Sequence, residues 1–188
     1  MKQLLALAHV IFLSCSHQAQ SANLCGFSTP DSPTYVFDKT NCSISVKGKK
    51  NYMSLDTFQV KKDRPFATLK GDSTYFISDD GKIYFAQEEV DDANYTIQPK
   101  HQQPATEISI GDMNGLLGYS EIFVQSMPKK QNVKNKSDFF SLTLDCLNIA
   151  AGGQKNSFIT MYCVPKSKTG KQNLQDYKNY ILNFREIP

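Results

Sequence analysis

The chain of 188 residues contains no tryptophan and only three histidines. After the N-terminal leader, His101 is the only histidine left. A Ser-His-Asp or Cys-His arrangement needs a histidine beside its nucleophile, and zinc sites usually draw on several histidines or free cysteines. Because His101 lies in a polar, glutamine-rich stretch, we expect it to be exposed rather than catalytic. We therefore predict no metal site and no cofactor.

Apolar runs of membrane-spanning length are also missing. The longest candidate, Leu4–Leu13, is well short of the roughly 20 residues that a membrane-spanning helix needs. With Lys2 before it and small residues after it, this run is typical of a secretory signal peptide. We assign residues 1–22 to that peptide and favour cleavage just before Ala22. In an alternative hypothesis the leader is a bacterial lipoprotein signal, and Cys15 becomes the lipidated first residue.

Net charge is small. Of 21 basic and 18 acidic residues, only Lys2 lies in the leader, which leaves 20 against 18, or +2, for the remaining chain. This balance does not argue for nucleic acid or an anionic membrane as a partner. The densest basic run, residues 129–136, has no aromatic side chains between its charges, and we interpret it as a solvated loop. Membrane contact is then limited to a lipid anchor.

Four cysteines follow Cys15 as two pairs of equal separation, Cys25 with Cys42 and Cys146 with Cys163. An even set behind an export signal predicts two disulfides and an oxidising compartment. A cross-link over a loop of this size contributes about 3 kcal/mol to stability. Pairing of Cys25 with Cys146 or Cys163 remains an alternative on sequence alone.

Composition favours strands, because 12 phenylalanines and 9 tyrosines accompany valine, isoleucine and threonine spread along the chain. We predict a single β-rich domain over residues 23–188, all-β or α+β, with an antiparallel sheet built from hairpins. Leu174, Tyr177, Ile181 and Phe184 lie at helical spacing and predict a C-terminal amphipathic helix. A strand over residues 180–184 is the alternative.

One predicted hairpin indicates which two cysteines pair with each other. Alternation places Cys146 on the apolar face of 139–149 and Cys163 on the apolar face of 157–164. A turn centred at residues 154–155 puts the two cysteines directly opposite each other. In the same way, alternation turns Cys42 inward on its own strand, where it is placed to anchor the N-terminus through Cys25.

The clearest hairpin joins Thr74–Ser78 to Ile83–Ala86 through Asp79-Asp80-Gly81-Lys82, because Asp-Gly between β-forming runs is a strong turn signal. Further strands are expected at 35–37, 42–46, 106–110 and 119–125. We expect a helical turn capped by Ser54 or Asp56, a surface loop at 101–105 and a turn at 111–115. The acidic residues that follow the hairpin are interpreted as a solvated loop rather than a carboxylate cluster: Glu88, Glu89, Asp91 and Asp92.

The stretch Tyr75–Ile97 resembles the repeat of the DKNNY family. Asp79-Asp80-Gly81 matches the turn of that repeat, Ile83-Tyr84-Phe85 its strand and 91–95 its closing segment, and Leu55–Val60 is a partial second copy. The resemblance implies β-hairpin repeats in an envelope protein of Gram-negative bacteria. It implies no catalytic residue.

These observations predict an exported, non-enzymatic bacterial envelope protein that acts by binding another protein. Its sharpest form is an immunity or inhibitor-type protein that neutralises a periplasmic toxin or hydrolase. One alternative is an accessory periplasmic or outer-membrane-anchored lipoprotein binding module, and another is a secreted hydrolase using paired carboxylates, as glycosidases do. A secreted eukaryotic protein is a further alternative, since glycosylation sequons begin at three asparagines: Asn41, Asn94 and Asn135.

Overall fold

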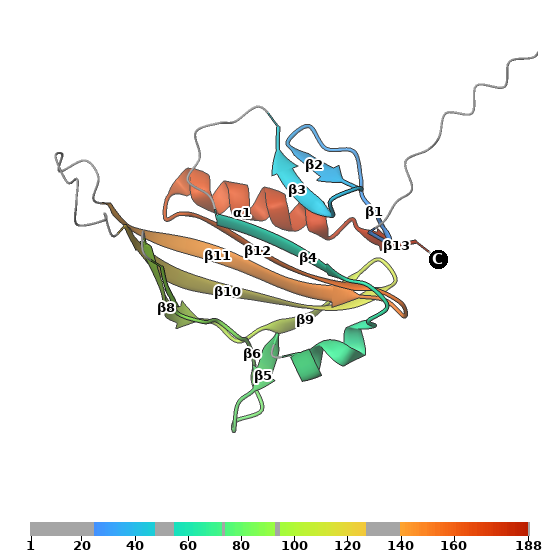
Figure 1. The fold of residues 1–188 in the computed structure, drawn as a ribbon, viewed down its shortest axis with the longest axis horizontal. Coiled ribbons are helices and arrows are strands. Elements are labelled where there is room, and N and C mark those ends of the chain that lie inside the picture. The colour runs from blue at the N-terminus through green and yellow to red at the C-terminus, as the bar shows by residue number, and fades with distance from the viewer. Residues whose placement is uncertain (1–24, 48–54, 73, 93–94, 127–139, 188) are drawn as a thin grey trace, which may run out of the picture.

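A computed structural model describes residues 25–47, 55–72, 74–92, 95–126 and 140–187 (Figure 1). The predicted signal peptide with Cys15, the basic run 129–136 and the asparagines of the second and third sequons lie outside these residues. Within them the fold is β-rich and antiparallel, with one α-helix near the C-terminus, which confirms the predicted fold class.

A seven-stranded antiparallel sheet forms the centre of the fold. Strand β10 is long enough to pair with β9 along its first part and with β8 along its second part. Across the sheet the strands are β4 (Leu55–Lys61), β12 (Ser157–Pro165), β11 (Ser141–Gly152), β10 (Met113–Ser126), β8 (Tyr95–Gln102) and β7 (Val90–Asp91), with β9 (Thr106–Ile110) beside β10.

The β11–β12 hairpin has the register that the cysteines predict. Cys146 lies directly opposite Cys163, with 4.0 Å between their Cα atoms, and a disulfide joins them. Both cysteines are fully buried on one face of the sheet, in an apolar cluster with Ile122, Val124 and Leu144. The strands run further toward the turn than predicted, since β11 continues to Gly152.

The other face of the sheet carries the predicted helix, α1 (Lys168–Ile181) (Figure 1). Ser167 caps its N-terminus, because the hydroxyl oxygen accepts a hydrogen bond from the Gly170 N–H at 2.9 Å. Leu174, Tyr177 and Ile181 turn toward the sheet and are buried. Because the apolar spacing follows the helical period through residue 181, the alternative strand over 180–184 is wrong.

A small hairpin lies beside α1 on the same face. It consists of β2 (Tyr35–Asp38) and β3 (Ser43–Val46), and Tyr35 stacks on Tyr180 of the helix with ring centroids 5.1 Å apart. The second disulfide, Cys25–Cys42, joins this hairpin to the short ladder of β1 (Phe27–Ser28) and β13 (Arg185–Glu186). Both predicted cysteine pairings are confirmed.

The face opposite α1 is partly covered by a hairpin and a 3-10 helix, η1 (Phe66–Asp72). The hairpin, β5 (Tyr75–Ile77) and β6 (Ile83–Phe85), is the one predicted from its Asp-Gly turn. Gly81 has φ +79° in that turn, a conformation that glycine adopts without steric cost. Leu69 of η1 and Phe85 of the hairpin are buried against Leu116 of β10.

Four local predictions are wrong. Cys42 lies in the turn before β3, with φ +50°, rather than on the strand itself. Residues 55–61, including Asp56, form strand β4 rather than a capped helical turn, because Phe58 and Val60 alternate into the core on the α1 side. The loop predicted at 101–105 starts later, since β10 pairs with β8 as far as Gln102. The turn at 111–115 is shorter than predicted, because β10 begins at Met113.

The fold also bears on the compartment. Two disulfides of the predicted pairing are typical of proteins from oxidising environments. In the part of the chain that the structure describes, α1 and the other helical segment are too short or too polar to cross a bilayer.

Candidate functional site

The β5–β6 hairpin projects from the body of the protein, away from α1 (Figure 1). Its inner face is structural, because Tyr75 and Ile83 pack against the cluster around Phe85. Its outer face carries Phe76 directly opposite Tyr84. The two rings are stacked, with centroids 5.7 Å apart and an interplanar angle of 23°. The hairpin therefore presents an aromatic pair on its outer face.

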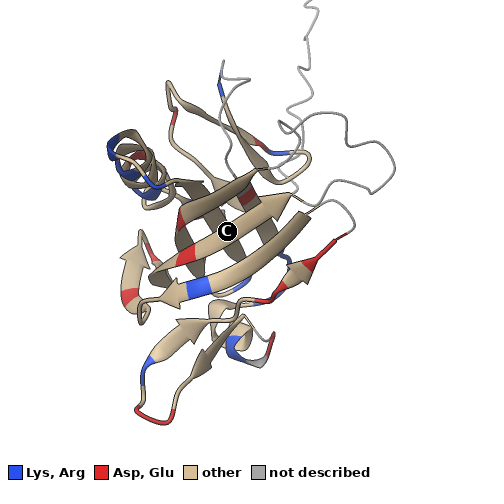
Figure 2. Ribbon diagram, turned by 90° about the vertical axis from the view of Figure 1, so that its left-hand side faces the viewer, with Lys and Arg blue, Asp and Glu red and all other residues tan. Residues whose placement is uncertain are grey.

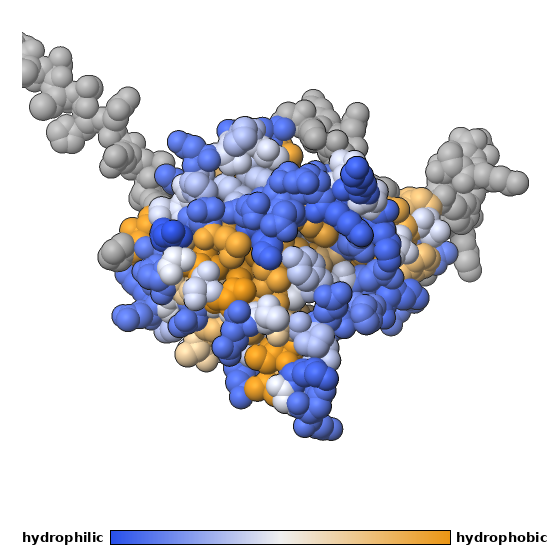
Figure 3. Space-filling view, turned by 180° about the vertical axis from the view of Figure 1, so that it is seen from behind, coloured by the Kyte–Doolittle hydropathy of each residue, from blue (hydrophilic) through white to orange (hydrophobic). Residues whose placement is uncertain are grey.

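Phe76 is the solvent-exposed member of this pair, whereas Tyr84 is half-buried. Phe76 is 51% exposed, and Ile77, on the same face as Tyr75, is 46% exposed; these are the two largest values among the large apolar side chains of the described residues. The space-filling view shows apolar surface on the hairpin just above a hydrophilic tip (Figure 3). Exposed aromatic rings of this kind are enriched at the centres of protein interfaces.

The tip of the hairpin is charged and held by its own hydrogen bonds. Ser78 Oγ donates to Asp80 Oδ1 at 2.5 Å, and Lys82 Nζ forms an ion pair with Asp80 Oδ2 at 2.5 Å. The hydrogen bonds from Lys82 and Ser78 lower the pKa of Asp80 to about 2. Figure 2 shows this mixture of acidic and basic residues at the end of the hairpin. A polar tip beside an apolar pair is the arrangement of an interface rim and centre.

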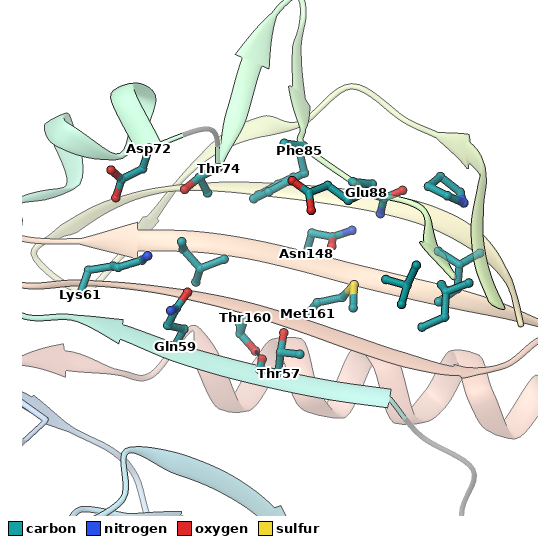
Figure 4. A pocket seen from close by; sticks show the side chains of 17 residues that line it. Thr57, Gln59, Lys61, Asp72, Thr74, Phe85, Glu88, Asn148, Thr160 and Met161 are labelled. Atoms are coloured by element: carbon teal, nitrogen blue, oxygen red, sulfur yellow. Dashed lines mark hydrogen bonds between the residues drawn. The ribbon is translucent and has the colours of Figure 1, made fainter. Parts of the chain in front are cut away.

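A groove of about 410 Å³ lies between the sheet and the segment that connects the hairpin to β7 (Figure 4). Its size is within the usual range for ligand sites. Aliphatic side chains, neutral amides and hydroxyls dominate the lining. The lining residues are Thr57, Gln59, Lys61, Asp72, Thr74, Phe85, Ala86, Gln87, Glu88, Val90, Ile97, Pro99, Ile122, Asn148, Ile159, Thr160 and Met161.

The floor of the groove contains a chain of polar side chains. Gln87 Nε2 and Asn148 Nδ2 both donate to Ser120 Oγ, at 2.6 Å and 2.9 Å. At one end Arg64 forms an ion pair with Asp72 Oδ1 at 2.6 Å. Gln87 Oε1 and Asp72 Oδ2 are buried, and neither has a hydrogen-bond partner among the described residues. Of the residues that line the groove, the sequence pointed to Glu88, which we interpreted as part of a solvated loop. The polar side chains of the floor were not singled out, because local sequence pattern does not show which residues are buried beside a groove.

A second, more polar hollow lies on the α1 side of the sheet and contains His101. In the strand register His101 lies opposite Glu121, and Glu121 lies opposite Asp145. Lys166 forms an ion pair with Glu121 at 2.6 Å, which raises the pKa of the lysine. His101 is exposed, as the polar, glutamine-rich sequence around it predicted.

Two acidic residues of this hollow, Glu121 and Asp145, lie directly opposite each other on adjacent strands. Side chains in such a pair are neighbours on one face of the sheet. Glu121 and Asp145 were not distinguished in the sequence, since only the register of β10 on β11 brings them together. The acids singled out there lie elsewhere, around β7: Glu88, Glu89, Asp91 and Asp92.

The His, Cys, Asp and Glu residues of the described part of the chain include no group of three or more placed to hold an ion. The four cysteines after the leader are all joined in disulfides. They leave no thiolate to act as a ligand or nucleophile.

Comparison with known proteins identified no relative of this chain. A scan against protein-family models, a search of curated proteins and a search of solved structures each found no match to this chain. The functional proposals therefore depend on the geometry described above.

Proposed function

We propose that this chain is an exported, non-enzymatic protein of the bacterial envelope that acts by binding another protein. Its sharpest form is an immunity or inhibitor-type protein that neutralises a periplasmic toxin or hydrolase. The observation that supports this proposal is the exposed Phe76, which stacks on Tyr84 on a projecting hairpin. A projecting element with a rigid aromatic pair suits insertion into a concave partner surface.

The compartment is proposed on separate grounds. Two disulfides support an oxidising environment, and the leader sequence supports export. Together they favour the periplasm, with lipid anchoring through Cys15 as the alternative. In the anchored form the protein would serve as an accessory binding module of the envelope.

Site-specific photo-crosslinking in the periplasm tests the binding proposal. A benzophenone amino acid replaces Phe76 in one variant and Val36 in the control, because Val36 is 40% exposed but lies on β2, beside α1. We expect one discrete protein adduct at position 76, and loss of that adduct when Tyr84→Ser is added. No adduct at position 76, or equal adducts at both positions, would contradict the proposal.

The partner identified by crosslinking can then be used to test whether the protein is an immunity or inhibitor-type protein. We expect purified protein to inhibit that toxin or hydrolase, and Phe76→Ser to weaken inhibition at least tenfold. Expression of the protein should also restore growth when the toxin is directed to the periplasm. A crosslinked partner whose activity is unchanged by the protein would favour the accessory binding module instead.

A carboxylate-dependent hydrolase is the second candidate function, and the direct opposition of Glu121 and Asp145 favours it. Assays on peptidoglycan and other envelope glycans test this candidate. Hydrolysis by the purified protein that falls at least a hundredfold in both Glu121→Gln and Asp145→Asn would support it. Absence of hydrolysis, or activity that persists in both variants, would remove it.

A further inference from the structure

The hydrogen bonds of the β5–β6 hairpin show which way its backbone groups point. At the tip end, the Ser78 N–H donates to the Lys82 carbonyl oxygen at 2.8 Å, and the bond at the base of the hairpin follows the same alternation. In an antiparallel ladder, residues that turn their backbone groups toward the partner strand alternate with residues that turn them away. Tyr75 and Ile77 therefore turn their N–H and C=O groups away from β6.

The outer edge of β6 is covered by the protein's own chain. The Ile83 carbonyl oxygen accepts a hydrogen bond from the Ala105 N–H at 2.7 Å. The Phe85 carbonyl oxygen accepts one from Gln102 Nε2, also at 2.7 Å. Both acceptors belong to residues that the alternation turns away from β5, which agrees with the pattern seen at the tip. One edge of the hairpin is thus already in use.

The outer edge of β5 is open. Strand β5 pairs with β6 alone, and no hydrogen bond among the described residues uses the outward backbone groups of Tyr75 or Ile77. The 3-10 helix η1 ends at Asp72, just before β5, and Figure 1 shows it beside the base of the hairpin. Ile77 lies further toward the tip. An open strand edge of this kind is a template for pairing with another chain.

Exposed apolar side chains lie on both faces of this open edge. Successive residues of a strand point to opposite faces, so Phe76 projects from the outer face of the hairpin and Ile77 from the inner face. These are the two most exposed large apolar side chains in the described part of the chain. Edge strands that avoid pairing commonly carry charges or proline. Strand β5, with the sequence Tyr-Phe-Ile, carries neither.

This arrangement limits the shape of a partner. A pocket that receives Phe76 alone contacts one face of the hairpin and leaves Ile77 in water. A strand beside β5 lies in the plane of the hairpin and presents its own side chains to both faces, so it covers both residues. Such a strand also supplies backbone donors and acceptors to the open edge. Finally, it adds a third strand to a two-stranded hairpin, which has little stability of its own.

We propose that β5 binds an extended segment of the partner protein. That segment pairs with the outward backbone groups of Tyr75 and Ile77 as a third strand, and its apolar side chains pack on Phe76 from one face and on Ile77 from the other. This inference rests on the proposed function, because it specifies how the partner engages the same hairpin. The partner must therefore present an unpaired extended segment with apolar side chains on both sides.

Photo-crosslinking of the full exported chain in the periplasm, with the benzophenone amino acid at position 76, tests the strand pairing. Ile77→Pro removes the outward N–H, and proline is tolerated on an edge strand where that N–H faces outward. Ile77→Thr is the matched control, because it removes the same apolar side chain and keeps the N–H. We expect the adduct yield to be about fivefold lower in Ile77→Pro than in Ile77→Thr, from the loss of one backbone hydrogen bond. The two purified variants should unfold at the same temperature.

A second crosslinking position tests the pairing without proline. The benzophenone amino acid at position 77 projects from the face opposite to that of position 76. Because an added strand covers both faces, we expect adducts of the same mass at the two positions. A partner that receives only the outer face of the hairpin gives an adduct at position 76 alone.

The outcomes separate this inference from the proposed function. Equal yields in the proline and threonine variants, or an adduct at position 76 with none at position 77, would overturn the strand pairing and leave the binding proposal standing. An adduct with the mass of two copies of this chain would assign the edge to a second copy and would also overturn the inference. Absence of an adduct at both positions would contradict the proposed function itself.

Discussion

Thr160 and Tyr177 are joined by a buried hydrogen bond of 2.6 Å between their side-chain oxygens. Thr160 lies on β12 in the central sheet, and Tyr177 lies on the sheet-facing side of α1. Thr160 Oγ1 also donates to the Thr57 carbonyl oxygen of β4 at 2.8 Å. One threonine thus connects the helix to two adjacent strands.

Tyr177→Phe should lower the free energy of unfolding by about 1 kcal/mol, because it removes one buried hydrogen bond while Thr160 keeps its acceptor on β4. Urea unfolding followed by circular dichroism measures the change. Tyr84→Phe is the control on the exposed hairpin and should change stability by less than about 0.5 kcal/mol. Equal effects of the two variants would contradict the structural role of the bond.

Stability should fall at alkaline pH. Burial raises the pKa of Tyr177 and of Tyr35 above the ordinary tyrosine value. In the unfolded chain these phenols ionise near pH 10, whereas in the folded protein they stay neutral to higher pH. Their contribution is therefore complete below about pH 10 and is lost as the pH rises above it.

Urea unfolding between pH 8 and pH 11.5 checks this dependence. We expect a steady decrease in unfolding free energy above about pH 10. Tyr177→Phe removes one of the groups and should show a shallower decrease. An identical pH profile for this variant would show that Tyr177 does not titrate differently in the two states.

Peptide mapping should identify which cysteines each disulfide joins. Digestion without reductant, followed by mass spectrometry, should give Cys25 linked to Cys42 and Cys146 linked to Cys163. Free thiols, or a link between the two pairs, would contradict the fold. Replacing Cys146 and Cys163 together by alanine should lower stability by about 3 kcal/mol, from the loop that this bond closes.

The aromatic pair of the hairpin should be dispensable for folding. Phe76→Ser and Tyr84→Ser should each change the unfolding free energy by less than about 0.5 kcal/mol, because neither ring packs in the described core clusters. Phe85→Ser, on the buried inner face of the same hairpin, should cost about 3 kcal/mol or more. A large loss in Phe76→Ser would show that the exposed stack is structural.

Gly81 offers a separate test of the hairpin turn. A β-carbon at this position would meet no atom within 4 Å, so only the φ of +79° opposes a side chain. Gly81→Val should therefore destabilise the turn by about 1–2 kcal/mol, whereas Gly81→Asn should have a smaller effect. Thermal unfolding and the crosslinking yield at position 76 measure the two consequences. Equal effects of valine and asparagine would contradict a conformational cause.

Local pattern determined several features of this protein by itself. The alternation that ends at Cys146, and the alternation that contains Cys163, fixed the register of their hairpin, because strand side chains repeat every two residues. The Asp80-Gly81 turn fixed the β5–β6 hairpin through its φ requirement. The spacing from Leu174 to Ile181 fixed the helix and the face that it buries. Each of these signals lies within a few residues of the structure that it specifies.

The candidate sites were decided only by tertiary structure. Asp56 lies in a strand rather than a helical turn because β12, about 100 residues further along the chain, supplies its pairing. Glu121 meets Asp145 through the same kind of distant register. The groove brings Asp72, Gln87 and Asn148 together from separate elements. A short stretch of sequence does not show which distant strand it will pair with, or which of its residues that pairing will bury. The fold class was therefore predictable from local pattern, whereas the binding surfaces were not.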